Sequence, residues 1–256
     1  MKSWVLFGIS FFVGLVISVS IVFFFVKSPK DPSDNKLLVG ISADFPPFSF
    51  IEKEGYVGFD IDLAMLIAKE LKREVIFKNM PFASLLPALQ LKQIEAVIGS
   101  LTPTPERSQK VLFSDNYIDN DSFVIVSLVE NKKESLADLK GGTVIVNVGY
   151  SADRYVEKLG DIFTVQRLKS PTDAFLALKN KIGDAFITAK SSVIGLAESE
   201  IADLFHIQSI ENTVEAAAIG FHKENVFLRN KVNEILEKFS RDGTLEKLKI
   251  KWNLSL

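Results

Sequence analysis

The chain has 256 residues, a formal net charge of −2 and no cysteine. The near balance of acids and bases does not indicate a basic surface for nucleic acid. The absence of cysteine excludes disulfides, thiolate metal sites and a lipid attached through an N-terminal cysteine. With 47% hydrophobic residues, the chain is long enough to bury one large core or two smaller ones.

The chain begins with an apolar segment. Residues 4–26 carry no charge, are rich in Phe, Val and Ile, and are followed by Lys27. A run of this length can span a bilayer, whereas the apolar part of a signal peptide takes about 7–15 residues. We therefore expect residues 1–26 to form an apolar helix that directs export, as an uncleaved anchor or as a cleaved signal. The polar, proline-containing residues 27–36 are expected to form a flexible linker.

Strand and helix patterns alternate over the next part of the chain. Short apolar runs predict buried strands at residues 37–41, 75–78 and 96–98. Helical patterns lie between them, at residues 61–71 and 84–92. Asp60 is expected to be the N-cap of the first helix. This order predicts a parallel sheet covered by helices.

A second alternation follows the first. The predicted strands are residues 121–128, 143–148, 163–167, 185–188 and 216–221. The predicted helices are residues 136–141, 151–159, 172–180 and 226–251, the last divided at Gly243. The fold class is therefore α/β with parallel-rich sheets.

The second alternation also predicts two lobes, provided that the last helices pack back on the first unit. The chain would then cross between lobes near residues 124–130 and 214–221, and these two crossovers would form a hinge. We expect lobe I at 37–125 and 220–256, and lobe II at 126–219. Ligand loops would lie at the carboxyl ends of strands and at helix N-termini, facing an interlobe cleft.

Four motifs carry a resemblance to a known family. They are residues 44–48 (Asp-Phe-Pro-Pro-Phe), 58–64 (Gly-Phe-Asp-Ile-Asp-Leu-Ala), 98–107 (Ile-Gly-Ser-Leu-Thr-Pro-Thr-Pro-Glu-Arg) and 113–117 (Phe-Ser-Asp-Asn-Tyr). In this order they resemble the periplasmic amino-acid-binding proteins of ABC importers, the family 3 solute-binding proteins, including the arginine-binding proteins of chlamydiae. The resemblance implies a type II periplasmic-binding-protein fold, a periplasmic location, an ABC permease of the inner membrane as partner, and no cofactor. We expect a monomer.

The resemblance also implies which residues of lobe I contact the ligand. Arg107 aligns with an arginine that grips the ligand's α-carboxylate, and its planar donor fork suits that group. The alternative is a surface arginine paired with Glu106. The other aligned positions are the loop residues Gly99, Ser100 and Thr102 and the aromatic walls Phe45 and Phe82. On composition alone, either phenylalanine could instead belong to the core.

In lobe II the resemblance points to a turn and to one departure from the family pattern. The turn is Gly149, Tyr150 and Ser151, whose backbone N–H groups are expected to donate to the carboxylate, with Ser151 also a helix N-cap. The family places an acid for the ligand's ammonium at Ala189, and relatives that bind cationic side chains often have Asp at Ser42. Because neither position is acidic here, we expect a neutral or acidic ligand, contacted by Lys190. Alternatively, Lys190 points to solvent and Glu215 or Glu198 reaches the ammonium.

Other functions remain open at this point. Similar proteins include cyclohexadienyl dehydratases, which use the same cleft for catalysis, and tethered binding domains that act as sensors. His206 and His222 lie far from the motif loops in sequence, and the sequence has no nucleophile-elbow or zinc-protease motif. We therefore expect that the protein is not an enzyme and has no catalytic residue. Asp60 and Asp62 are expected to be structural rather than metal ligands.

Overall fold

The computed structural model describes residues 35–53, 55–194 and 202–254. The predicted apolar helix at 1–26 and most of the predicted linker lie outside these ranges. The chain divides into two units, Met1–Lys36 and Leu37–Leu256, and the helices described below belong to the second. Within the described ranges, no helix combines the length and the apolar character needed to cross a membrane.

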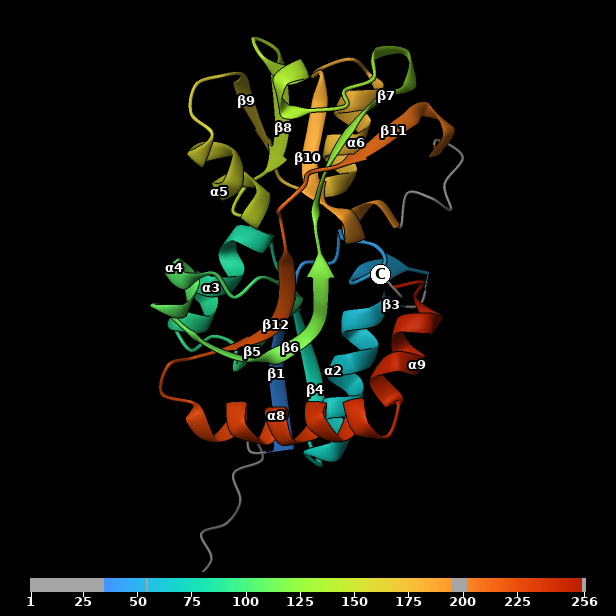
Figure 1. The fold of residues 1–256 in the computed structure, drawn as a ribbon. Coiled ribbons are helices and arrows are strands. Elements are labelled where there is room, and N and C mark those ends of the chain that lie inside the picture. The colour runs from blue at the N-terminus through green and yellow to red at the C-terminus, as the bar shows by residue number, and fades with distance from the viewer. Residues whose placement is uncertain (1–34, 54, 195–201, 255–256) are drawn as a thin grey trace, which may run out of the picture. The chain divides into compact units, whose positions relative to one another are not determined.

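Two mixed sheets of five strands each form the frame of this unit (Figure 1). The first has the order β4-β1-β5-β12-β6, and the second has the order β11-β7-β10-β8-β9. The strands of the first are β1 (Lys36–Ile41), β4 (Glu74–Asn79), β5 (Ala96–Leu101), β6 (Leu112–Asp121) and β12 (Glu215–Phe221). Those of the second are β7 (Phe123–Leu128), β8 (Thr143–Asn147), β9 (Thr164–Leu168), β10 (Ala185–Ala189) and β11 (Phe205–Ser209). We call each sheet with its helices lobe I and lobe II.

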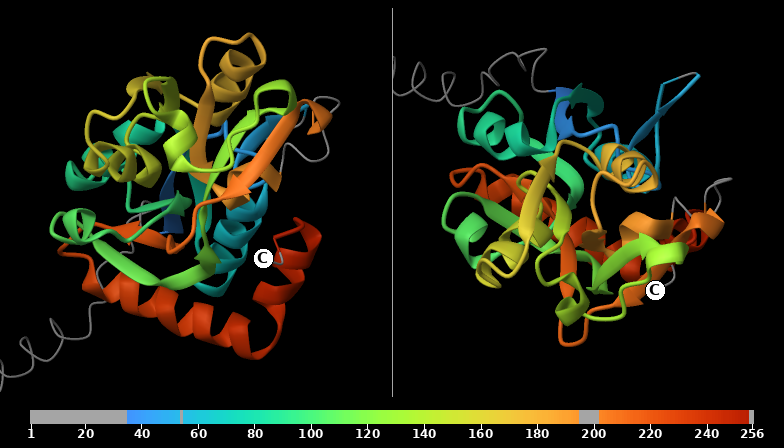
Figure 2. Two further views of the ribbon diagram at one scale, coloured as in Figure 1. Left: turned by 45° about the horizontal axis from the view of Figure 1, so that its top comes forward. Right: turned by 90° about the horizontal axis from the view of Figure 1, so that it is seen from above.

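The helices cover the sheets, as the alternating pattern predicts (Figure 2). In lobe I they are α2 (Phe59–Glu70), α3 (Phe82–Gln90), α4 (Pro105–Ser108), α8 (Val226–Arg241) and α9 (Thr244–Lys251). In lobe II they are α5 (Ser151–Lys158) and α6 (Pro171–Lys179), which pack on β8 and β10. Short 3-10 helices are Val129–Asn131, Leu136–Leu139, Lys190–Val193 and Ala202–Leu204. As predicted, Gly243 divides the C-terminal helices, with φ of 76°.

The chain crosses between the sheets at two neighbouring places (Figure 1). It leaves lobe I between β6 and β7, at residue 122, and returns between β11 and β12. Both crossings lie a few residues earlier than the pattern predicts. Glu215 pairs with Asp121 where β12 and β6 adjoin, so the two crossings lie side by side. The sheets are not parallel throughout, because β12 runs antiparallel to both β5 and β6, and β7 antiparallel to β10 and β11.

The N-cap prediction for Asp60 is wrong. The helix α2 begins at Phe59, and its N-cap is Gly58. At this glycine φ is 130°, and an added Cβ would lie 2.1 Å from the carbonyl oxygen of Phe48. Only glycine allows this close approach. The helix therefore starts two residues earlier than its apolar periodicity indicates. Asp60 is instead a buried residue of the first turn, with 0% of its surface exposed.

Several other elements differ from the sequence-based expectation. Ser151 is not an N-cap, because Tyr150 occupies that position at the start of α5. The strand β6, the hairpin of β2 (Phe50–Glu52) and β3 (Gly55–Val57), and the edge strand β11 were not predicted. The strands β2, β3 and β11 are short and partly exposed, and β6 is rich in polar residues, so all four lack the continuous apolar run that marks a buried strand.

Candidate ligand-binding site

A cavity lies where the two crossings meet, and we call it the Glu215 cavity. Lobe I contributes Phe45 from the turn after β1, and Ser100 and Thr102 from the end of β5. Lobe II contributes the turn residues Tyr150 and Ser151 and the end of β10. The hinge itself contributes Asp121 and Glu215. The lining therefore comes from the carboxyl ends of strands in both lobes, as expected for a ligand site in an α/β fold.

Two carboxylates at the hinge face this cavity. The Oε2 atom of Glu215 is buried, and no described residue gives it a hydrogen bond. Asp121 is 4% exposed and accepts from Ser191 twice, from its hydroxyl at 2.5 Å and from its N–H at 3.1 Å. Burial raises the pKa of Asp121 and the neighbouring charge of Glu215 adds to this, while the Ser191 bonds oppose it. Because its Oε2 atom has no hydrogen bond from a described residue, Glu215 can accept one from a cationic group of a ligand.

Arg107 supplies the positive charge beside the Glu215 cavity. Its guanidinium donates to the carbonyl oxygens of Thr102 at 2.8 Å and, across the cleft, Gly149 at 2.7 Å. It also lies 5.6 Å from the ring centroid of Phe82. Burial lowers the pKa of Arg107 to about 10, opposed chiefly by the charge of Glu215, so the group stays charged at neutral pH.

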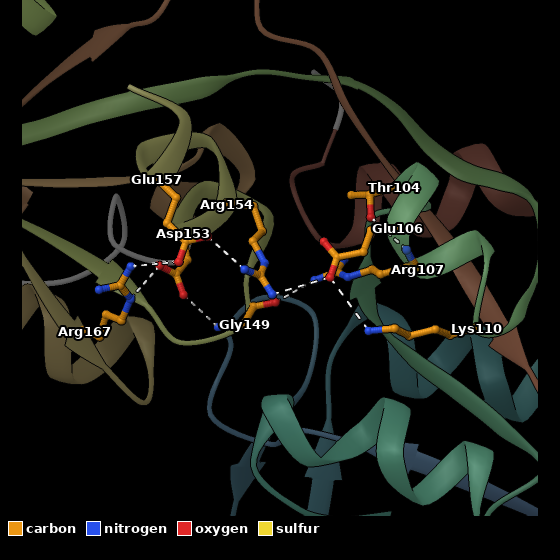
Figure 3. Close-up of polar contacts among 9 residues, drawn as sticks. All are labelled: Thr104, Glu106, Arg107, Lys110, Gly149, Asp153, Arg154, Glu157 and Arg167. Carbon is orange, nitrogen blue, oxygen red and sulfur yellow. Dashed lines mark hydrogen bonds and ion pairs between the residues drawn. The ribbon is translucent and has the colours of Figure 1, made fainter. Parts of the chain in front are cut away.

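The alternative reading of Arg107, a surface arginine paired with Glu106, does not describe its contacts. Glu106 is exposed and pairs instead with Lys110 at 3.7 Å and, across the cleft, with Arg154 at 3.5 Å (Figure 3). Arg107 lines a second cavity together with Phe82, Gly149 and Ser151. Ser151 lines both cavities, so the guanidinium and Glu215 lie on two sides of the same turn.

Hydrogen bonds within lobe II hold the turn at 149–151. The N–H of Gly149 donates to Asp153 at 3.2 Å, and Asp153 in turn accepts from Arg167 at 2.8 Å (Figure 3). The N–H of Tyr150 donates to the carbonyl oxygen of Asn147 at 3.1 Å. Two of the three N–H groups expected to contact a ligand therefore have acceptors within the protein. Ser151, which opens α5, remains the candidate donor, because N–H groups in the first turn of a helix lack helical partners.

The side chain of Tyr150 joins the lobes, a role that the resemblance did not imply. Its ring stacks on Phe82 with centroids 4.0 Å apart, and it meets Phe45 edge to face at 5.9 Å. In the described part of the chain no group bonds its buried hydroxyl. Burial raises the pKa of Tyr150, the charge of Asp44 adds to this, and Arg107 opposes it. An aromatic cluster of two lobe I residues and one lobe II residue thus flanks the cavity.

Of the remaining predicted residues that the structure describes, one lines the Glu215 cavity and the others lie elsewhere. Ser42 is buried and donates to Asp44 at 2.9 Å, so a carboxylate lies beside this neutral position. Ala189 lines the Glu215 cavity, and Gly99 is buried within β5. Lys190 is exposed and is not one of the described residues that line the two cavities. Glu198 lies outside the described residues.

Sequence reasoning missed several residues of the site. Asp121, Thr188 and Ser192 line the Glu215 cavity, and the hydroxyl of Thr188 donates to that of Ser192 at 2.9 Å. No family motif includes them. The one available signal was position, since Asp121 precedes the apolar run that crosses between lobes and Thr188 lies near the end of a predicted strand.

The chain is similar to known extracellular solute-binding proteins. Residues 37–255 match the model of the bacterial extracellular solute-binding proteins, family 3. The arginine-binding extracellular protein ArtP of Bacillus subtilis is 35% identical over 230 residues, which cover 88% of this chain and 89% of ArtP. The probable ABC transporter arginine-binding protein ArtJ of Chlamydia trachomatis serovar D is 25% identical, with 90% of each chain covered.

Solved structures give the same result. An ancestral arginine-binding protein bound to arginine has a TM-score of 0.80 and 36% identity, covering 85% of this chain and 98% of that one. The ancestral amino-acid-binding protein AncCDT-1, a precursor of cyclohexadienyl dehydratase, has a TM-score of 0.79 and 32% identity, covering 86% and 96%. These matches confirm the type II periplasmic-binding-protein fold and a binding role rather than an enzymatic one. The chain belongs to the family 3 bacterial extracellular solute-binding proteins.

Proposed function

We propose that this protein binds an L-amino acid between its lobes and delivers it to an ABC permease. The observation that carries the proposal is the placement of opposite charges around one cleft. Arg107 suits an α-carboxylate, and the buried, unbonded oxygen of Glu215 suits an α-ammonium. Ser151 lies between them and can donate its N–H to the same carboxylate.

The charge of the site favours a cationic side chain. Three carboxylates lie at the site: Glu215 and Asp121 in the cavity lining, and Asp44, whose charge acts on Tyr150. Two positive charges oppose them, Arg107 and the exposed Lys190, whose charge acts on Asp121. A zwitterionic ligand adds one charge of each sign and leaves this excess of carboxylates unchanged. A second positive charge on the ligand would offset part of it, so we propose an arginine-like ligand.

This proposal replaces the expectation of a neutral or acidic ligand, which is not supported. That expectation relied on Ala189 and Ser42 being neutral. The acids instead come from the hinge and from Asp44, two residues beyond Ser42. Lys190, the anticipated partner of an acidic ligand, is exposed. Arginine-binding relatives point the same way.

Lobe closure would connect binding to transport. Ligand would dock first on Arg107 and Thr102 in lobe I, and the turn at 149–151 would then close over it. Closure follows only from contacts that the ligand makes in the closed state and not in the open one. A periplasmic protein, tethered to the inner membrane if residues 1–26 are retained, would present this closed form to the permease as a monomer.

A thermal-shift panel tests the proposal. A ligand that binds only the folded protein raises its unfolding midpoint by mass action. We expect L-arginine to give the largest shift, with L-lysine next and L-glutamate and L-citrulline smaller. L-citrulline is the sharpest comparison, because it has nearly the shape of arginine without the charge. A larger shift with L-glutamate or L-citrulline than with L-arginine would contradict the cationic ligand.

A further inference from the structure

The first turn of α2 lies beneath two loops of the ligand site. The N–H groups of Phe59 and Asp60 donate to the carbonyl oxygens of Pro47 and Phe48, each at 2.9 Å. These bonds fix the turn that carries Phe45. The side chain of Asp60 points the other way, to the end of β5. One helix start therefore holds the cavity wall on one side and, on the other, the end of β5 with Thr102 (residues 99–102), which we call the binding loop.

Asp60 supports the binding loop directly. Its Oδ2 atom accepts from the N–H of Ser100 at 2.9 Å, and the same N–H lies 3.0 Å from the hydroxyl of Tyr117. Ser100 lines the Glu215 cavity and has φ of 47°, in the left-handed region that residues other than glycine rarely adopt. Such a conformation persists where neighbouring groups enforce it, and the Asp60 carboxylate and the Tyr117 phenol are those groups here.

The Asp60 carboxylate accepts its hydrogen bonds from neutral groups. The carboxylate is 0% exposed, and among the described residues its Oδ1 atom has no hydrogen-bond partner. Of the elements packed against it, β6 presents the titratable phenol of Tyr117, while β5 and the turn at 45–49 present Ser100 and Phe48, which do not titrate. Burial raises the pKa of Asp60 to about 7, opposed by the hydrogen bonds from Tyr117 and Ser100.

We propose that Asp60 is the positioning residue of the binding loop, and that ligand affinity depends on the charge of its carboxylate. This inference rests on the proposed amino-acid site. As an anion, Asp60 accepts strongly from both Ser100 and Tyr117 and keeps Ser100 in its left-handed conformation. When it gains a proton, both bonds weaken and the loop loses its support.

The direction of the pH effect follows from linkage. Binding requires the loop conformation that the ionised carboxylate supports, so the pKa of Asp60 is lower in the complex than in the free protein. Binding then releases a proton, and affinity falls as the pH falls through 7. If binding lowers the pKa by about one unit, complete protonation weakens binding about tenfold.

Two measurements on the whole protein test this inference. The first follows the amide signal of Ser100 by NMR from pH 5 to pH 8.5 without added amino acid. We expect it to titrate in the wild type and not in Asp60→Asn. The second measures the Kd of L-arginine over the same range, which we expect to change about tenfold in the wild type and to stay flat in Asp60→Asn.

Two further variants separate positioning from general stability. Tyr117→Phe removes a donor that lowers the pKa of Asp60, so the midpoint of both profiles moves to higher pH. Asp62→Asn is the matched control, because Asp62 lies on the same helix but bonds Trp252 and Lys251 instead of the loop. An Asp60→Asn protein with the wild-type Ser100 titration overturns the inference, as does an Asp62→Asn protein that loses it. Failure to bind any amino acid would contradict the proposed function alone, because the NMR measurement needs no ligand.

Discussion

The site brings buried charges together from distant parts of the sequence. Arg107 belongs to a motif, whereas Glu215 lies over a hundred residues away and is placed by the return of the chain through the hinge. Arg107 and Glu215 are both partly buried, so each loses part of its hydration and gains from a partner of opposite charge. An amino acid provides both partners in one molecule, one at each end of its backbone.

Replacing Glu215 tests the ammonium partner. Glu215→Gln keeps the shape of the side chain and removes its charge, so we expect the Kd of L-arginine to rise by roughly 10- to 100-fold, the value of a charge-assisted bond. Isothermal titration calorimetry checks this. Glu211→Gln is the control, since Glu211 is exposed on the turn before β12 and should bind as the wild type does. An unchanged Kd in Glu215→Gln would remove Glu215 from the site.

At the scale of elements, the start of α2 explains why two loops hold their form. Gly58 lets the helix approach the carbonyl oxygen of Phe48, and this approach aligns the donors at Phe59 and Asp60. The apolar periodicity that predicts helices does not register such a contact. For this reason the sequence indicated the helix correctly but misplaced its first turn and the role of Asp60.

A pair of glycine variants isolates that close approach. Gly58 and Gly55 both have large positive φ, 130° and 138°, but an added Cβ at Gly55 meets nothing within 4 Å. Gly55→Ala should therefore cost only backbone strain, about 1–2 kcal/mol of unfolding free energy. Gly58→Ala should cost more, because the Cβ displaces the turn at 45–49. Chemical denaturation measures both, and equal losses would show that the contact with Phe48 is unimportant.

At the scale of the whole molecule, strand and helix alternation was sufficient to predict two lobes and two crossings. The sequence could not predict which side chains meet at the hinge, because that depends on the register between β6 and β12, which no local pattern encodes. Asp121 and Glu215 illustrate this, since they become neighbours only through strand pairing. The prediction of a neutral or acidic ligand failed for the same reason. It considered the two aligned positions, Ala189 and Ser42, and not the acids that folding places near them.

Direct contact between lobes also emerges only from the fold. Tyr150 stacks on Phe82, and Arg107 bonds Gly149 across the cleft. Tyr150→Ala should favour the open form and raise the radius of gyration measured by small-angle scattering in buffer without amino acids. Tyr155→Ala is the control, because Tyr155 packs within lobe II on Phe123. Equal radii for Tyr150→Ala and the wild type would show that this ring does not hold the lobes together.

The most direct test of an amino-acid site compares L-arginine with two truncated analogues by calorimetry. Agmatine lacks the α-carboxylate that Arg107 would hold, and 5-guanidinopentanoate lacks the α-ammonium that Glu215 would hold. We expect L-arginine to bind with micromolar or tighter affinity and each analogue to bind about 100-fold more weakly, since each leaves one partly buried charge without a partner of opposite charge. Agmatine or 5-guanidinopentanoate binding as tightly as L-arginine, or no binding of L-arginine at all, would contradict an amino-acid site formed by Arg107 and Glu215.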